Sequence, residues 1–383
     1  MDFSWPQEYT EYRKKVIDFA KKELDDDVLT RDKNCIFAKD LWQKCADFGI
    51  LALASTKGYG GDSDDVDVLK SVVAMEALGY ACKDTGLISG MNAQMWAVQM
   101  ALLTFGTEEQ KQKYLPPLVS GEWYGAHGLT EEEAGSDVFS MRMRAEKVEG
   151  GYILNGEKRL ITLGPIANLA LIFANTKPNQ SKWGITAFLV ENTFDGYSAS
   201  PAREKLGLRT TPLGEITLKD CFVPEENRLG REGAGLSLTN HSLEYDRCFI
   251  LTGKLGAMER MLEETIAFAK KREQFGQSIS KFQSVSNRIV DMKLRYETSR
   301  LLLYKLAWLK HNKKSAMLEA AMLKLFLSEN YLESSLHAVR TRGGNAFLSD
   351  YEVDRYLRDA TGGVLYAGTS DIQKNIIAKF LGL

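Results

Sequence analysis

The stretch Gly128–Asp137, "GLTEEEAGSD", stands where the pattern of the chain changes. Before it, apolar residues recur at three- and four-residue spacing, which is typical of helices packed on one face. After it, short β-rich runs alternate with turn residues as far as about residue 226. The stretch therefore marks the passage from a helical segment to a β segment.

Long helical patterns return after Gly233 and continue to the C-terminus, and the first of them runs without interruption from residue 236 to 276. Three long helices and a shorter one pack most easily as a four-helix bundle. We therefore predict an α+β protein with an N-terminal helical domain (1–121), a middle β-barrel domain (122–230) and a C-terminal four-helix bundle domain (231–383).

The helical patterns of the first third carry recognisable end signals. A glycine that adopts the left-handed conformation can close a helix, and Gly49, Gly79 and Gly106 are candidates. Thr107 and Gln110 have the spacing of a capping box, which predicts that another short helix begins there.

Composition excludes several classes of function. The 383 residues are 44% hydrophobic and 26% charged, which is typical of a globular protein. The 49 basic residues nearly balance the 51 acidic ones, so no net charge favours nucleic acid or an anionic membrane. No apolar run reaches the roughly 18 to 20 residues of a membrane span. The N-terminal stretch lacks the pattern of an export or transit peptide, so we expect a cytoplasmic protein.

Cysteine and histidine usage argues against a metal site. The five cysteines are odd in number and form no Cys-x-x-Cys pair, and the four histidines are not paired at ligand spacing. We expect neither a disulfide framework nor a bound metal.

Three segments are candidates for binding an anion or a heterocycle. Gly135 and Ser136 can offer backbone N–H groups, and Arg272 of "KKREQFG" can pair with a phosphate beside Phe275. Arg340 precedes a Gly-Gly turn in "RTRGGNAF". Taken alone, each segment is more often an ordinary surface turn or a basic helix end.

The three segments occur in this order together with "AGTSDIQ", residues 367–373, and this combination resembles the acyl-CoA dehydrogenase family of flavoproteins over essentially the whole chain. "GLTEEEAGSDVFS" is similar to the family's first flavin-binding segment. "REQFG", followed by Phe282 and Gln283, is similar to its central bundle segment, and "LRDATGGVLYAGTSDIQ" to its C-terminal segment. The resemblance implies non-covalently bound FAD between the β domain and the bundle, in a homotetramer.

The resemblance also implies which residues bind FAD. The isoalloxazine and ribityl are expected at Leu129, Thr130, Gly135, Ser136, Leu160, Ile161 and Thr162, and the ribityl and pyrophosphate at Thr369 and Asp371. Arg272, Phe275, Arg340 and Gly344 are expected to reach FAD from a neighbouring subunit, and Phe282 and Gln283 of the central bundle segment are also expected to bind FAD. The chain departs from the family at Leu160, where tryptophan is usual, and at Arg340, where glutamine is usual.

The catalytic base is not at its usual place. Family members remove an α-proton from a thioester with a carboxylate, and the usual carboxylate position is Ala367 in this chain. Alanine cannot act as a base, although its backbone N–H can still polarise the thioester carbonyl. Tyr366, Ala367 and Arg247 are expected to line the substrate site.

A minority of the family carries its base on the first helix of the bundle, just before an arginine. Counting from the flanking "EGAG" and "GKLG" places this position at Asp246, followed by Arg247. Glu244 lies two residues earlier, about 200° around a helix, so only one of the two carboxylates can face the flavin. Glu244 heads an apolar stripe of the predicted helix, and this periodicity favours Glu244 rather than Asp246 as the base. We predict Asp246 as the base, with Glu244 as the alternative.

Two segments, "FQSVSNRIVDMKLR" and "GTSDIQKNIIAKFLGL", are most similar to the family's dehydrogenases that act on prolyl groups tethered to a carrier protein. The predicted function is FAD-dependent α,β-dehydrogenation, or oxidation, of a prolyl-like acyl thioester on an acyl or peptidyl carrier protein. One alternative is a short- or branched-chain acyl-CoA dehydrogenase that passes electrons to an electron-transfer flavoprotein rather than to oxygen. Another is a flavin monooxygenase of the same fold.

Overall fold

The computed structural model describes residues 5–24, 27–177 and 183–383. The first four residues of the N-terminal stretch, which bear on the expected lack of a leader, lie outside these ranges. The α-helices are α1 (Gln7–Glu23), α2 (Val28–Asn34), α3 (Lys39–Asp47), α4 (Val68–Ala81), α5 (Thr85–Asn92), α6 (Met100–Phe105), α7 (Glu108–Val119), α8 (Gly235–Phe249), α9 (Thr252–Lys271), α10 (Gln283–His311), α11 (Met317–Arg342), α12 (Val353–Gly363) and α13 (Ser370–Phe380).

Shorter elements connect them. The strands are β1 (Gly125–Gly128), β2 (Arg144–Val148), β3 (Gly151–Thr162), β4 (Leu169–Asn175), β5 (Ile185–Glu191), β6 (Tyr197–Ala199), β7 (Leu213–Pro224), β8 (Arg228–Leu229), β9 (Glu273–Gln274) and β10 (Gln277–Ser278). The short helices are η1 (Leu51–Ala54), η2 (Lys57–Tyr59), the π-helix η3 (Ala93–Gln99), η4 (Val138–Ser140), η5 (Gly164–Ile166), η7 (Glu225–Asn227), η8 (Ile279–Lys281), η9 (Gly343–Phe347) and η10 (Ser349–Tyr351).

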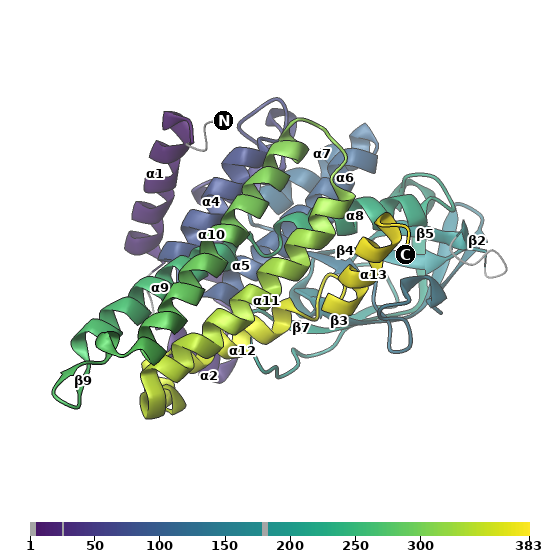
Figure 1. Cartoon of the computed structure of the whole chain (residues 1–383). Coiled ribbons are helices and arrows are strands. Elements are labelled where there is room, and N and C mark those ends of the chain that lie inside the picture. Colours follow the sequence, from purple (N-terminus) through teal and green to yellow (C-terminus); the bar gives the residue numbers. More distant parts are fainter. Residues whose placement is uncertain (1–4, 25–26, 178–182) are drawn as a thin grey trace.

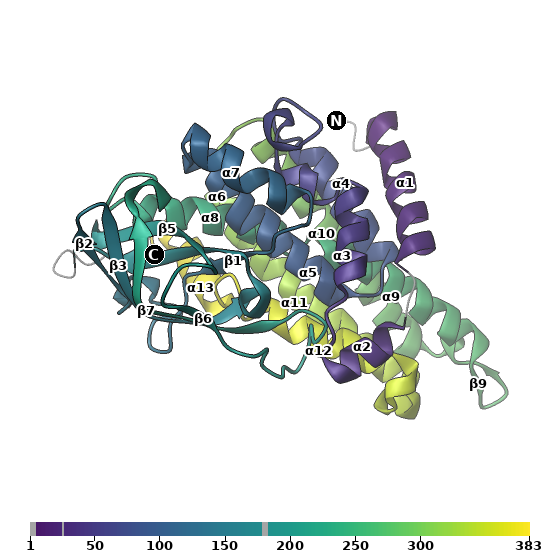
Figure 2. The same cartoon turned by 180° about the vertical axis from the view of Figure 1, so that it is seen from behind.

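Figure 1 shows the helices gathered into one body with the sheet at one end of it, and Figure 2 shows the same arrangement from behind. The two helical segments that flank the sheet in the sequence share one hydrophobic core, which includes Val16 of α1, Leu78 of α4, Leu255 of α9 and Leu327 of α11. The expected succession of helical, β and helical segments is therefore present, and the first and last segments pack directly on each other.

Glycines make this contact between the two helical segments close. A Cβ on Gly79 of α4 would overlap the carbonyl oxygen of Gly253 of α9, and a Cβ on Gly256 would overlap the carbonyl oxygen of Glu76. The two helices therefore touch backbone to backbone. Gly79 lies inside α4, so its expected role as the end of a helix is wrong. Gly106 follows α6 with a φ of −68°, so it does not take the left-handed conformation either.

The sheet has the strand order β6-β7-β3-β2-β4-β5-β8, and β1 pairs in parallel with β4. Strand β4 is buried along its whole length because both of its faces are covered. Its alternate side chains belong to two different cores. One faces helices and includes Leu169, Leu171 and Phe173, and the other lies among β2, β3, β5 and β7 and includes Ala170, Ile172 and Ala174.

The helix expected over residues 236–276 is interrupted. Helix α8 ends at Phe249, and α9 begins at Thr252 after Leu251, whose φ and ψ are −96° and 0°. Both parts pack on α10 and α11, but α8 also contacts β5 and η3, whereas α9 packs mainly on α4. Because of the break, the segment predicted as one helix packs against the sheet through α8 and against the helical core through α9.

In the described part of the chain, the structure shows no helix whose length and apolar character would let it span a membrane. The same part also contains no group of three or more His, Cys, Asp or Glu side chains able to hold a metal ion.

Candidate active site

The two candidate bases on α8 have different surroundings. Glu244 accepts a hydrogen bond from Lys310 of α10, with Nζ 2.9 Å from Oε1, and the two side chains are only 16% and 11% exposed. The same ammonium lies 4.1 Å from the centre of the Tyr245 ring. Glu244 is therefore held in an ion pair against the bundle.

Asp246 has no such partner, since its carboxylate makes no hydrogen bond within the described residues. Burial raises the pKa of Asp246 to about 7, and the charges of Arg247 and Lys324 oppose this rise. A carboxyl group with this pKa exchanges a proton near neutral pH, which is what a general base requires.

The loop between α12 and α13 lies against this part of α8. Arg247 Nε donates to the carbonyl oxygen of Ala367 (3.4 Å), and Gln373 Nε2 donates to the carbonyl oxygens of Ala367 (3.1 Å) and Gly368 (2.8 Å). Ala367 has a φ of +54°, which is unusual for a residue with a Cβ. Such a backbone is kept only where neighbouring contacts enforce it, and it often marks a functional site.

Tyr366 completes this group. Its hydroxyl is buried without a hydrogen-bond partner in the described structure. Burial, followed by the charge of Asp246, raises the pKa of the phenol well above its usual range. The structure thus brings Asp246, Arg247, Tyr366 and Ala367 together and directs Glu244 elsewhere.

A buried ion pair fixes the "GLTEEEAGSD" loop at the sheet. Glu131 accepts hydrogen bonds from Lys158 Nζ (2.7 Å) and from the backbone N–H groups of Arg142 (2.5 Å) and Met143 (3.1 Å). Lys158 also donates to the carbonyl oxygen of Leu129 (3.2 Å). Burial lowers the pKa of Lys158 to about 8, although the charge of Glu131 opposes the shift. The ion pair and these hydrogen bonds therefore anchor the side of the loop that faces the sheet.

The outer side of this loop is open. Gly135 and Ser136 are exposed, and a Cβ on Gly135 would meet nothing within 4 Å. Beside them, the carbonyl oxygen of Thr130 accepts from the N–H of Arg159 (2.8 Å), which ties the loop to β3. Leu160 follows with 58% of its surface exposed and a φ of +58°.

These features fit a flavin. A flat heterocycle needs an apolar side chain to rest on and an anchored backbone beside it, and Leu160 and the loop offer both. Ile161 is 2% exposed and holds the strand in the sheet core, while Thr162 is partly exposed. Thr369 accepts from the N–H of Ile372 (3.3 Å) at the start of α13, and Asp371 is exposed in the first turn of that helix. These residues would hold the cofactor from the sheet on one side and from the start of α13 on the other.

The other predicted cofactor residues lie at the far end of the helical body, where Figure 1 shows the β9 hairpin. Phe275 is 94% exposed with a φ of +53°, and its ring meets Phe282 edge-on at 6.1 Å. Gln283 begins α10 nearby. Arg288 of α10 donates to the carbonyl oxygen of Arg340 (3.5 Å), which places the end of α11 and Gly344 at the same end. Within one chain, Arg272 and these residues do not meet Asp246.

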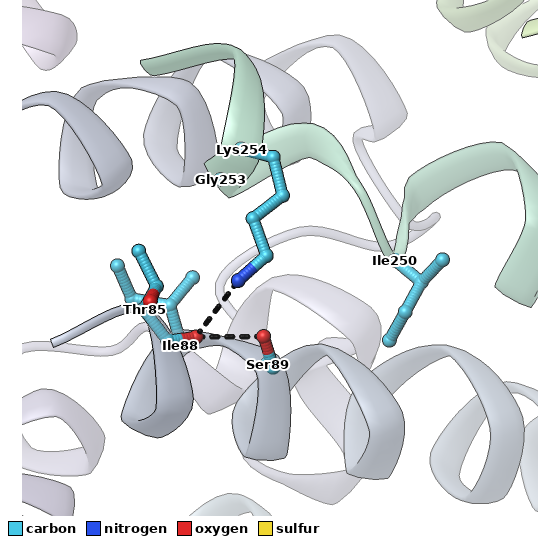
Figure 3. Close-up of a pocket in the computed structure, with 6 residues that line it drawn as sticks. All are labelled: Thr85, Ile88, Ser89, Ile250, Gly253 and Lys254. Carbon is cyan, nitrogen blue, oxygen red and sulfur yellow. Dashed lines mark hydrogen bonds between the residues drawn. The ribbon is translucent and has the colours of Figure 1, made fainter. Parts of the chain in front are cut away.

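A narrow recess lies one helical turn beyond Asp246, where the N–H of Ile250 donates to the Asp246 carbonyl oxygen (2.9 Å). Figure 3 shows this recess, which is too tight to hold a water molecule and is lined by Thr85, Ile88, Ser89, Ile250, Gly253 and Lys254. Lys254 is 2% exposed and donates to the carbonyl oxygen of Thr85 (3.3 Å), which also accepts from Ser89 Oγ (2.6 Å).

Sequence reasoning missed three buried lysines near these sites: Lys158, Lys254 and Lys324. Each is a single basic residue within an apolar or mixed pattern, so no motif distinguishes it from a surface lysine. The mainly apolar run around Lys324, "AAMLKLFL", was the one available signal.

The chain is similar to proteins of a known family over most of its length. It matches the models of the acyl-CoA dehydrogenase N-terminal domain over residues 6–122, the middle domain over 126–221 and the C-terminal domain over 233–382. The chain belongs to the acyl-CoA dehydrogenase family, and it is an FAD-dependent oxidoreductase.

Three relatives are similar over their whole length. An L-prolyl peptidyl-carrier-protein dehydrogenase of Serratia sp. is 38% identical over 100% of this chain and 99% of its own. The crystal structure of the prolyl acyl carrier protein oxidase AnaB is 47% identical and covers 99% of this chain and 100% of its own, with a TM-score of 0.97. The structure of PigA with FAD and proline is 38% identical, covers 100% of both chains and also has a TM-score of 0.97.

Proposed function

We propose that this protein oxidises a prolyl-like aminoacyl thioester tethered to a carrier protein, with Asp246 as the general base. The observation that carries the assignment is the contrast on α8. Asp246 has no hydrogen-bond partner within the described residues and a pKa raised by burial to about 7, whereas Glu244 is engaged by Lys310. A carboxylate already committed to a salt bridge is a poor base because it must break that pair to take a proton.

Each residue around Asp246 has a role in this proposal. The Asp246 carboxylate takes the proton from the carbon next to the thioester carbonyl. The backbone N–H of Ala367 stabilises the negative charge that develops on the carbonyl oxygen. Arg247 holds the Ala367 segment in place through its hydrogen bond to the carbonyl oxygen of that residue. When bound, FAD supplies the acceptor for the hydride that leaves the neighbouring carbon.

The substrate class rests on two observations. The relatives named above act on prolyl groups attached to carrier proteins or bind proline. The recess beyond Asp246 is too tight to hold a water molecule and is lined in part by the buried Lys254, whose ammonium a long aliphatic chain would have to displace. Both observations favour a short, polar acyl group. A carrier-protein substrate also accords with the cytoplasmic location expected from the sequence.

We further infer a homotetramer in which subunits share flavin sites. Phe275 and Phe347 are 94% and 93% exposed at the far end of the helical body, and such apolar exposure is characteristic of interfaces. Oxygen is the proposed electron acceptor, since one relative is named an oxidase; an electron-transfer flavoprotein is the alternative.

The test is anaerobic mixing of the flavin-loaded enzyme with prolyl-loaded carrier protein and, separately, with short acyl-CoAs, while the oxidised-flavin absorbance is followed. We expect bleaching by the carrier-bound prolyl group alone, at least a thousandfold slower in Asp246→Asn and within about tenfold of the wild type in Glu244→Gln. Bleaching by an acyl-CoA alone would refute the carrier-protein substrate. Retained bleaching in Asp246→Asn would refute the base.

A further inference from the structure

Lys324 is a buried cation without a hydrogen-bond partner. It lies on α11, its relative exposure is 0%, and its Nζ makes no hydrogen bond in the described structure. An ammonium group removed from water without a partner is costly, and such a group is retained where a nearby charge or a function compensates.

The charges that act on Lys324 come from the candidate active site. They are Asp246 and Arg247 of α8, which packs against α11, and Glu329 of α11 itself. Arg247 is engaged by the carbonyl oxygen of Ala367, and Glu329 accepts a hydrogen bond from Ser370 Oγ (2.5 Å). The carboxylate of Asp246 and the ammonium of Lys324 are the two charges of this group that lack a hydrogen bond within the described residues.

We propose that Lys324 is a positioning residue that keeps the Asp246 carboxylate ionised, and so ready to accept the substrate's proton. The inference deepens the proposed function, because it assumes that Asp246 is the base. Lys324 acts through its charge across the α8–α11 contact and touches neither the reacting carbon nor the carbonyl.

The electrostatics of the pair agree with this role. Burial raises the pKa of Asp246 to about 7 and lowers the pKa of Lys324 to about 8, and each charge moderates the shift of the other. Arg247 favours the ionised form of Asp246 as Lys324 does. Tyr366 and Cys248 are further titratable groups on which the charge of Asp246 acts. At about pH 7.5 both Asp246 and Lys324 are more than half in their charged forms. Removing the ammonium would therefore raise the pKa of Asp246 further.

The experiment measures the rate of anaerobic flavin reduction by prolyl-loaded carrier protein from pH 5.5 to 9. In the wild type we expect the rate to rise with pH through an ionisation near 7. In Lys324→Met, and in Lys324→Gln should the first variant fold poorly, this ionisation should move up by about 1 unit. The rate at pH 6 should then fall about tenfold.

A second readout needs no turnover. The infrared band of a protonated carboxyl group, identified by its loss in Asp246→Asn, should persist to a pH about 1 unit higher in the Lys324 variants. Lys310→Met is the matched control, because Lys310 is also a largely enclosed lysine facing α8, with its side chain 11% exposed, but is paired with Glu244. The control should leave the ionisation of Asp246 unchanged.

The outcomes separate the two hypotheses. An ionisation that Asp246→Asn removes, but that stays in place in the Lys324 variants, would overturn the role of Lys324 and leave the base assignment intact. An equal shift of the Asp246 ionisation in Lys310→Met would also overturn the role of Lys324, because the shift would then follow from the loss of any lysine near α8. If Asp246→Asn removed neither the ionisation nor the activity, both the base assignment and the role of Lys324 would fall.

Discussion

At the scale of single residues, the two carboxylates of α8 illustrate a conflict between function and stability. Glu244 is paired, whereas Asp246 has no hydrogen-bond partner within the described residues and burial raises its pKa. Burying a charged group without a close partner destabilises the folded state, and such a cost is common at catalytic sites. We therefore expect removal of the charge at Asp246 to stabilise the folded state and removal of the charge at Glu244 to destabilise it.

Asp246→Asn should lose activity and gain stability at pH 8. The pKa of Asp246 is about 7 in the folded state and near 3.8 in the unfolded chain. Because only the folded state holds the proton between these values, the contribution of Asp246 to stability falls as pH rises from about 4 to 7. Thermal unfolding should show the variant equal to the wild type near pH 4 and at a higher Tm at pH 8.

Glu244→Gln is the counterpart, since it leaves the Lys310 ammonium without its carboxylate. We expect it to lower the free energy of unfolding by about 1 to 3 kcal/mol, measured by denaturant titration. A stabilised Glu244→Gln variant together with a destabilised Asp246→Asn variant would reverse the assignment of the two carboxylates.

At the scale of elements, the break between α8 and α9 decides what the bundle can do. Helix α8 presents Asp246 and Arg247 to the loop before α13, whereas α9 supplies the glycines that contact α4. One straight helix has a single direction and cannot follow both neighbours. The β9–β10 hairpin likewise extends beyond the helical body and carries Phe275 away from its own chain's site.

The exposed hairpin gives a prediction about cofactor retention. Phe275→Ala should leave the fold of the chain unchanged, because the ring is 94% exposed within one subunit. If Phe275 covers the flavin of a neighbouring subunit, the variant should lose FAD severalfold faster during dialysis, measured by absorbance. Phe222→Ala, at an aromatic residue of β7 that is 43% exposed, is the control and should retain FAD. Equal retention in both variants would argue against a shared site.

At the scale of the whole molecule, the predicted cofactor residues of one chain lie too far apart to form one complete FAD site. One set lies at the sheet and α13, and the other lies at the opposite end of the helices. A closed symmetric assembly can bring the far end of one copy to the sheet of another.

We therefore expect the flavin-loaded protein to have a mass four times that of the 42.9 kDa chain in light scattering after size-exclusion chromatography. Because ligands shared between subunits stabilise the assembly, removal of FAD should promote dissociation at low protein concentration. A stable, flavin-retaining monomer would contradict the shared-site arrangement.

The sequence by itself determined the class of fold and the family. Apolar periodicity predicted the helical and β segments, and Thr107 and Gln110 form the predicted capping box at the start of α7. The ordered motifs indicated an acyl-CoA dehydrogenase with FAD, which the comparisons confirm. These features are local in the chain, so periodicity and motif spacing record them directly. The division at residues 121 and 230 and the roles of individual site residues stay predictions.

Only the tertiary structure decided which groups face one another. Periodicity favoured Glu244 and the flanking motifs favoured Asp246, and the difference in their surroundings comes from Lys310 on α10 and Lys324 on α11, about 65 and 80 residues away in the chain. Gly79 carried the signal of a helix end, but the approach of α9 explains its presence inside α4. Long-range packing sets the burial, and therefore the pKa, of a side chain, and a local pattern carries no record of that packing.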